Sequence, residues 1–249
     1  MNFAIIAAGE GSRLQSEGSQ TAKPLVRVGG QTLVGRLIDT FMANGAENID
    51  VITNSSRPEV AEYLRSLDAP LTVISAQTPS SMHSMAAMNL GRHRSKVVAT
   101  TVDTVFPAAD FARYVEAFRR CSDADAFMAI TPLIDDEKPL YVDFDPSTGR
   151  IRAFLDTPTP TTRYCSGGIY GLTPAALEVL DRCIAEGQSR MRGFQRALIE
   201  SGLRVKGFVI DRIIDVDHVG DIAKAESIAS PSDNTIENIS LTNHDQDNG

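Results

Sequence analysis

The chain has 249 residues, a hydrophobic fraction of 42% and a formal net charge of −8. This length lies near the upper limit for one hydrophobic core, and the hydrophobic fraction is too high for a disordered chain. An acidic chain lacks the basic face that binds a nucleic-acid backbone, so we expect no nucleic-acid partner.

The sequence also argues against a membrane protein, a secreted protein and a protein held together by zinc or disulfides. No run approaches the roughly 18 apolar residues of a membrane span, so we expect no membrane partner. The start Met1–Ala8 lacks the basic region of a signal peptide. The three cysteines have neither zinc-ligand nor disulfide spacing. We therefore expect a cytoplasmic protein.

The first half of the chain alternates short apolar runs with segments of helical periodicity. The runs predict buried parallel strands, and the alternation predicts βαβ units in an α/β fold. The expected strands are residues 3–8, 49–53, 71–74 and 97–102, and the expected helices are 33–43, 59–67 and 82–90.

Beyond residue 125 the strand-like runs are joined by turn-rich connections, which predicts antiparallel or mixed additions to the same sheet. These strands are residues 126–130, 141–144, 151–155, 168–172 and 205–210, with helices at 175–186, 194–201 and 219–229. We expect one domain over residues 1–229. Residues 230–249 are polar without apolar periodicity, which predicts a flexible tail.

A glycine-containing loop directly follows the first strand. It reads Ala7-Ala8-Gly9-Glu10-Gly11-Ser12-Arg13-Leu14, and Lys23-Pro24 comes after it. Loops at this edge of an open α/β sheet bind ligands, and glycines let backbone N–H groups approach phosphate oxygens. Arg13 and Lys23 add cationic donors. The spacing fits neither a P-loop nor a dinucleotide fingerprint, whose third glycine is replaced by Leu14.

These motifs resemble those of the nucleotide-sugar pyrophosphorylases and the MobA-like nucleotidyltransferases, whose signature is G-x-G-[ST]-R-[LM] followed by K-P. The segment Ile214–Asp221 is similar to the late D-[IV]-[DG]-T-P-E-D motif of that family. The resemblance spans residues 3–229. It implies a Rossmann-like three-layer α/β/α fold with a mixed, mostly parallel central sheet.

The resemblance also implies roles for the residues that match. Arg13 and Lys23 would be catalytic and would neutralise charge on the α- and β-phosphates. Gln77 stands where uridylyl-type members carry a base-reading glutamine ahead of a turn of small residues. The implied nucleotide-binding residues are Ala7, Ala8, Gly9, Gly11, Ser12, Gln77, Ser80 and Ser81.

Three carboxylates are candidate ligands of Mg²⁺, which takes one or two protein carboxylates together with phosphate and water. Asp103 ends the run 97–102, at the expected ligand edge of the sheet. Asp215 and Asp217 fit the second ligand position that the resemblance implies. Being two residues apart on an extended segment, they should face one side. Asp215 is the first choice of the two.

The sequence departs from the family pattern where the acceptor would bind. Thr157 replaces the lysine of a V-E-K-P segment, and the stretch Tyr164–Tyr170 lacks the asparagine of the sugar contact. Four residues are candidates for acceptor binding: Lys138, Asp156, Arg163 and Gly167. The arginines between Arg190 and Arg196 form a further basic patch, which a solvated helix start would also explain.

Three functions fit these residues. The first is transfer of a nucleoside monophosphate from a nucleoside triphosphate (NTP) to a sugar 1-phosphate, with Mg²⁺ as cofactor and release of pyrophosphate. The second is a cytidylyltransferase that acts on a non-sugar phosphate such as phosphocholine. The third is a non-catalytic sensor of a nucleotide or nucleotide sugar. The partners expected of the enzyme are an NTP and a phosphorylated small-molecule acceptor.

Overall fold

The computed structural model describes residues 1–132 and 137–229. The expected tail, residues 230–249, lies outside these residues. None of the helices in the described ranges is both long and apolar enough to cross a membrane.

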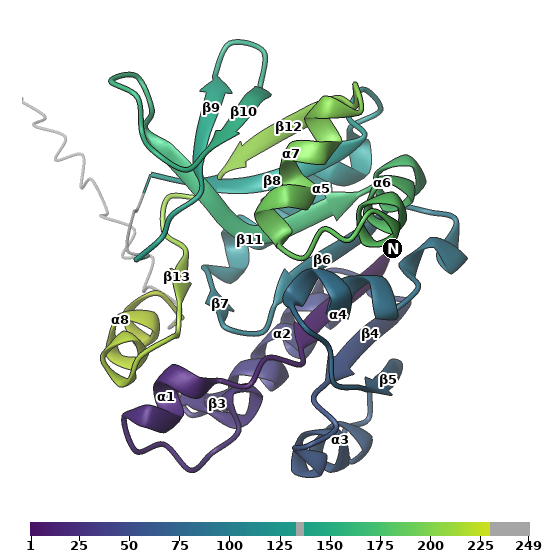
Figure 1. The fold of residues 1–249 in the computed structure, drawn as a ribbon. Coiled ribbons are helices and arrows are strands. Elements are labelled where there is room, and N and C mark those ends of the chain that lie inside the picture. Colours follow the sequence, from purple (N-terminus) through teal and green to yellow (C-terminus); the bar gives the residue numbers. More distant parts are fainter. Residues whose placement is uncertain (133–136, 230–249) are drawn as a thin grey trace, which may run out of the picture.

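The described residues form one nine-stranded mixed sheet (Figure 1). Its strand order is β5-β4-β1-β6-β11-β8-β12-β10-β9. The strands are β1 (Asn2–Ala7), β4 (Asn48–Thr53), β5 (Leu71–Ser75), β6 (Val97–Thr101), β8 (Ala126–Thr131), β9 (Tyr141–Asp145), β10 (Arg150–Leu155), β11 (Tyr164–Leu172) and β12 (Val205–Val209). Strands β5, β4, β1 and β6 are parallel, whereas β11 runs antiparallel to both β6 and β8. The prediction of a mixed sheet is confirmed.

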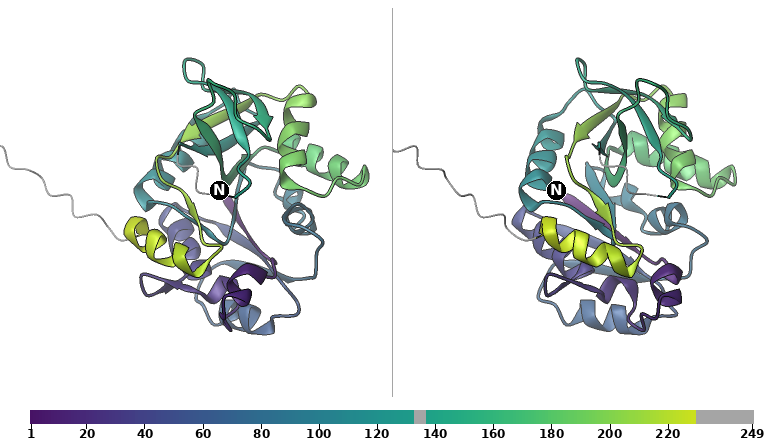
Figure 2. Two further views of the ribbon diagram at one scale, coloured as in Figure 1. Left: turned by 60° about the vertical axis from the view of Figure 1, so that its left-hand side comes forward. Right: turned by 90° about the vertical axis from the view of Figure 1, so that its left-hand side faces the viewer.

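Helices cover both faces of the sheet (Figures 1 and 2). Because side chains alternate along a strand, Phe3 and Ile5 of β1 enter one core while Ala4 and Ile6 enter the other. The first core packs against α1 (Ser12–Ser16), α2 (Leu33–Ala43), α3 (Pro58–Arg65), α5 (Ala108–Arg120) and α8 (Val219–Ala229). The second packs against α4 (Ser81–Ala87), α6 (Pro174–Ala185) and α7 (Met191–Glu200). The three-layer α/β/α architecture is therefore confirmed.

Two short ribbons complete the fold at the carboxyl edge of the parallel strands. Strand β7 (Thr104–Val105) pairs with β13 (Ile214–Asp215), and β2 (Arg27–Val28) pairs with β3 (Gln31–Thr32). The β7–β13 pair returns the segment after β12 to the end of β6, as Figure 1 shows. The backbone N–H of Val216 donates to the Asp103 carbonyl at 3.0 Å and extends this contact.

The sequence analysis missed one long helix, α5. Its apolar residues recur at the spacing of one helix face, and Phe111, Tyr114, Val115 and Phe118 are all buried. The signal was therefore in the sequence. The expected helix 82–90 is shorter in the structure, because α4 ends at Ala87 and a 3₁₀ turn, η2 (Leu90–His93), follows.

Candidate functional site

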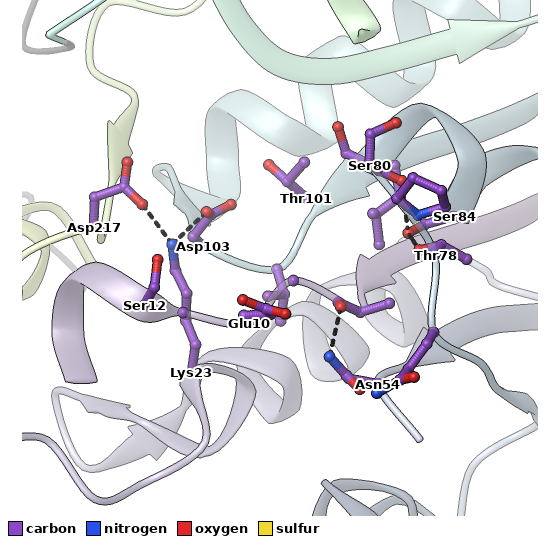
Figure 3. Close-up of a pocket in the computed structure, with 18 of the residues that line it drawn as sticks. Glu10, Ser12, Lys23, Asn54, Thr78, Ser80, Ser84, Thr101, Asp103 and Asp217 are labelled. Atoms are coloured by element: carbon purple, nitrogen blue, oxygen red, sulfur yellow. Dashed lines mark hydrogen bonds and ion pairs between the residues drawn. The ribbon is translucent and has the colours of Figure 1, made fainter. Parts of the chain in front are cut away.

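A pocket of about 850 Å³ opens at the carboxyl edge of β1, β4 and β6. The glycine loop, the start of α4 and the end of β6 supply most of its wall (Figure 3). The predicted residues that line it are Ala8, Gly9, Gly11, Ser12, Arg13, Lys23, Gln77, Ser80, Ser81, Asp103 and Asp217. The fold thus brings together residues that lie up to about 200 positions apart in the sequence.

Lys23 lies at the centre of the charged end of this pocket. It begins the 3₁₀ turn η1 (Lys23–Leu25), and its Nζ donates to Asp103 Oδ2 and to Asp217 Oδ1, each at 2.6 Å (Figure 3). Only 10% of the lysine side chain is exposed. Gly11 allows this close packing, since a Cβ at that position would lie 3.0 Å from Lys23 Cβ, and its φ of +66° favours glycine.

The charges at this end stabilise one another. Burial lowers the pKa of Lys23, but the neighbouring Asp103 and Asp217 carboxylates reverse this effect and raise it overall. Burial raises the pKa of Asp103, but the Lys23 ammonium and hydrogen bonds from Lys23 and Thr101 lower it overall. Lys23 therefore stays protonated and Asp103 stays ionised at neutral pH.

Arg13 completes the cationic side of the pocket. It lies on α1, directly after the glycine loop, and its Nη1 donates to Asp217 Oδ2. Its Nη2 lies 3.5 Å from Glu137 Oε2. The side chain is 45% exposed, so its guanidinium remains accessible from the pocket.

Asp215 and Asp217 have different surroundings. Asp217 lines the pocket, whereas Asp215 does not and instead accepts a hydrogen bond from Thr104 Oγ1 at 3.0 Å. Part of the Asp215 residue is exposed, but its carboxyl group is buried. This burial raises the pKa of Asp215 to about 7, together with the negative charges of Asp103 and Asp217. The hydrogen bond from Thr104 and the charge of Lys23 act in the opposite direction. The geometry favours Asp217, rather than the first-choice Asp215, as the partner of Asp103.

The donor set formed by Asp103 and Asp217 fits Mg²⁺. In the two described ranges, no group of three or more His, Cys, Asp or Glu side chains could hold a metal ion. Mg²⁺ does not need such a cage, because it usually keeps several waters and takes one or two carboxylates plus substrate phosphates. Asp103 and Asp217 meet that requirement, because each places a carboxylate oxygen 2.6 Å from Lys23 Nζ and both line the pocket.

The other end of the pocket consists of small polar side chains. Ser80 is the N-cap of α4, and its Oγ accepts from the His83 backbone N–H at 3.4 Å and lies 2.9 Å from His83 Nδ1. The Ser84 hydroxyl lies 2.5 Å from Thr78 Oγ1. Figure 3 shows these groups on the side of the pocket away from Lys23.

A second pocket, of about 720 Å³, lies between the β9–β10 hairpin and the start of α7. Two of the four predicted acceptor residues, Lys138 and Asp156, line it. Asp156 Oδ1 pairs with Arg192 Nη1 at 2.6 Å and with Arg196 Nη2 at 2.8 Å. The unassigned basic patch thus forms one wall of this pocket, and Arg190 lines it as well.

Glu137 connects the two pockets. It lines the second pocket, while its carboxylate lies 3.5 Å from Arg13 Nη2, which belongs to the first. The same carboxylate lies 3.5 Å from His218 Nε2. The two pockets are therefore neighbours.

Besides Asp215, three predicted residues lie apart from both pockets. Ala7 is 2% exposed and packs in the core. Arg163 is exposed and donates to the Pro160 and Thr162 carbonyls of its own turn. Gly167 is buried, and a Cβ there would lie 2.3 Å from Ile213 Cδ1, so this glycine permits close packing.

The sequence analysis missed Asn54 and Thr101, which both line the first pocket. Asn54 directly follows β4 and Thr101 ends β6. Position at the carboxyl end of a parallel strand was the available signal, the same one that identified Asp103.

Comparisons with known proteins agree with this geometry. The sequence profile of the MobA-like NTP transferase domain matches residues 3–155. The bifunctional protein GlmU of Zymomonas mobilis is 33% identical over 73 residues, which are 29% of this chain and 16% of that protein. GlmU of Neisseria meningitidis serogroup A is 35% identical over 65 residues, 26% of this chain and 14% of that protein. The chain thus matches only a small part of these relatives.

Solved structures share the fold over nearly the whole chain. The inositol-1-phosphate CTP transferase of T. maritima superposes with a TM-score of 0.76 at 18% identity, covering 93% of this chain and 96% of that one. The nucleoside-diphosphate-sugar pyrophosphorylase of Vibrio cholerae RC9 gives a TM-score of 0.67 at 16% identity, with 90% and 99% coverage. The profile match covers well over half of the chain, and the chain is therefore a member of the MobA-like NTP transferase domain family of nucleotidyltransferases.

Proposed function

We propose that the protein transfers a nucleoside monophosphate from an NTP to a sugar 1-phosphate. The observation that carries the proposal is the convergence of the glycine loop, Arg13, Lys23, Asp103 and Asp217 on one pocket. That set supplies backbone donors, two cations and two metal-binding carboxylates, which are the groups that an in-line displacement at phosphorus requires. Because its substrates are an NTP and a phosphorylated metabolite, we expect the enzyme to act in the cytoplasm.

In this reaction an oxygen of the acceptor phosphate attacks the α-phosphorus of the NTP. A new P–O bond forms, the bond from the α-phosphorus to the oxygen that bridges it to the β-phosphorus breaks, and pyrophosphate leaves with the electron pair. Lys23 and Arg13 bind and orient the phosphates and stabilise the negative charge that builds on them. Mg²⁺ held by Asp103 and Asp217 would supply further charge neutralisation when bound.

We assign the acceptor to the second pocket. Arg190, Arg192 and Arg196 of its wall, together with Lys138, give it a local positive charge in an otherwise acidic protein. Arginine is suited to the bidentate recognition of phosphate. The contact between Glu137 and Arg13 supports this choice, because it joins this pocket to the NTP pocket.

A non-sugar phosphate acceptor is the second candidate. The position of Gly167 favours this candidate. The segment around Gly167 resembles a sugar contact, but the glycine is buried against Ile213 and lines neither pocket. An acceptor bound mainly through its charge would not need that contact.

The experiment that tests the proposal is the release of pyrophosphate from each of five triphosphates (ATP, CTP, GTP, UTP and dTTP). Each is incubated with Mg²⁺ and a panel of sugar 1-phosphates, inositol phosphate and phosphocholine. Release that depends on one acceptor, together with formation of the coupled product, supports the proposal and identifies both substrates. Binding of an NTP with no release against any acceptor would favour the sensor instead.

A further inference from the structure

Asn54, at the end of β4, makes the contact from which we draw a further inference. It lines the NTP pocket but is only 7% exposed. Its Nδ2 donates to the carbonyl oxygen of Ala8 at 3.2 Å (Figure 3). Ala8 is the residue at which β1 gives way to the glycine loop.

The orientation of the Asn54 amide is fixed by a second set of contacts. Its Oδ1 accepts from the Ser56 backbone N–H at 2.9 Å and from Ser56 Oγ at 2.8 Å. This is an Asx turn, in which the side chain accepts from the backbone two residues ahead. Since Oδ1 must face these donors, the NH₂ group must face Ala8.

The β-ladder does not need this contact. Strands β1 and β4 already pair from Asn2 with Asn48 to Ala7 with Thr53. The bond from Asn54 to Ala8 adds one link beyond the last pair, where the backbone leaves the sheet and enters the loop. This hydrogen bond therefore restrains the glycine loop rather than the sheet.

The carbonyl groups of Glu10 and Gly11 are held in a similar way, whereas that of Gly9 accepts no hydrogen bond from the described residues. The Glu10 carbonyl accepts from Gln15 Nε2 at 2.6 Å, and the Gly11 carbonyl accepts from the Gln15 backbone N–H at 3.1 Å. In contrast, the backbone N–H groups of Gly9, Glu10 and Gly11 donate to no acceptor within the described residues. The loop therefore has engaged carbonyls at Ala8, Glu10 and Gly11, and available amides at Gly9, Glu10 and Gly11.

This asymmetry matters for an anionic ligand. A carbonyl oxygen directed at a phosphate repels it, whereas an available N–H group attracts it. We propose that Asn54 is a positioning residue for the triphosphate: its side chain holds the Ala8 carbonyl so that the amides of the glycine loop are presented to the phosphates. Gln15 has the same role at Glu10. The inference rests on the proposed function, because it takes the NTP to be the ligand of this pocket.

The test uses Asn54→Asp and Asn54→Ala. Aspartate is isosteric and can still accept from Ser56, but it loses the donor to Ala8 and adds a negative charge. Alanine loses the donor without adding a charge, so the two variants together separate the lost hydrogen bond from charge repulsion. The probe is tripolyphosphate with Mg²⁺, measured by calorimetry, because it contains the phosphates and no base.

Asn54→Ala should bind tripolyphosphate about tenfold more weakly than the wild type, the factor expected for one lost buried hydrogen bond, and Asn54→Asp should bind it more weakly still because of its added charge. For the NTP turned over best by the wild type, KM should rise in the same proportion while kcat changes less, which a general loss of stability would not produce. The control is Thr72→Ala, which removes the contact of Thr72 Oγ1 with Asn48 Oδ1 at the opposite end of β4. It should leave both quantities unchanged.

Gln15→Leu keeps the proposal testable if the Asn54 variants do not fold, because Gln15 is exposed. It should weaken tripolyphosphate binding in the same direction. Wild-type affinity in folded Asn54→Ala, or in Gln15→Leu when the Asn54 variants are unfolded, would overturn the inference and leave the proposed function intact. A wild-type protein that binds neither tripolyphosphate nor any NTP would overturn both.

Discussion

The ammonium group of Lys23 lies 2.6 Å from a carboxylate oxygen of Asp103, although 80 residues separate the two in the sequence. Lys23 begins a 3₁₀ turn after the glycine loop, and Asp103 follows the end of β6. The adjacency of β1 and β6 in the sheet brings these two loops to the same edge. The pair thus connects the glycine loop, which we propose binds the phosphates, with the carboxylate expected to hold the metal.

Replacing Lys23 with alanine should reduce turnover by at least 10², or about 3 kcal/mol of transition-state stabilisation. The reason is the loss of a cation that neutralises charge on the phosphates. The measurement is the rate of pyrophosphate release at saturating substrates. Lys206→Ala is a matched control, since Lys206 also pairs with an aspartate, Asp123, at 2.6 Å but lies outside both pockets. Near-normal turnover in folded Lys23→Ala would contradict the assignment of this lysine.

Asp103→Asn and Asp217→Asn should each abolish most of the Mg²⁺-dependent binding of the NTP. Asparagine preserves the shape but removes the charge that attracts the cation. Calorimetric titration with the NTP, with Mg²⁺ and with EDTA, measures this dependence. Asp215→Asn is the comparison, because its side chain bonds to Thr104 and does not line the pocket. The reverse result, with metal dependence lost only in Asp215→Asn, would show that the ligand is the first-choice residue after all.

Arg190→Ala should raise KM for the acceptor about tenfold, the effect of losing one charge-assisted hydrogen bond, and should leave KM for the NTP unchanged. Arg190 lines the second pocket, and its guanidinium forms no ion pair in the part of the chain that the structure describes, so its removal breaks no ion pair there. Arg163→Ala is the informative counterpart, since Arg163 was predicted to bind the acceptor but, among the described residues, hydrogen-bonds only to its own turn. A larger effect from Arg163 than from Arg190 would move the acceptor away from this pocket.

The stabilising effect of Asp125 should depend on pH. Its carboxylate accepts from the Arg204 backbone N–H at 2.8 Å and from Arg204 Nε at 3.2 Å, and these contacts lower its pKa against the opposing effect of burial. With a lower pKa in the folded state, the contribution is fully present above the ordinary pKa of aspartate and is lost as the pH falls through the folded pKa. Asp125→Asn should therefore lower Tm near neutral pH, and the difference should shrink in strong acid. A difference in Tm that is constant from neutral pH to strong acid would contradict this assignment.

The sequence by itself determined most of the strands and the position of the glycine loop after the first of them. The run Phe3–Ala8 is buried on both faces of the sheet, so its continuous apolar composition was enough to predict a buried strand. Gly11, Arg13 and Lys23 lie within a short segment, and their spacing is fixed by local backbone geometry. Such local relationships can be predicted from a sequence, which is why these residues and the family were found without coordinates.

Only the tertiary structure decided which distant side chains meet. The alternation of side chains along an extended segment predicted that Asp215 and Asp217 would face the same side. In the structure β13 ends at Asp215, and the Asp217 backbone N–H donates back to the Asp215 carbonyl at 3.1 Å. That turn directs Asp217 toward Lys23 and leaves Asp215 beside Thr104. Side-chain direction after a strand depends on the turn that follows, and that turn is set by packing between segments far apart in the chain.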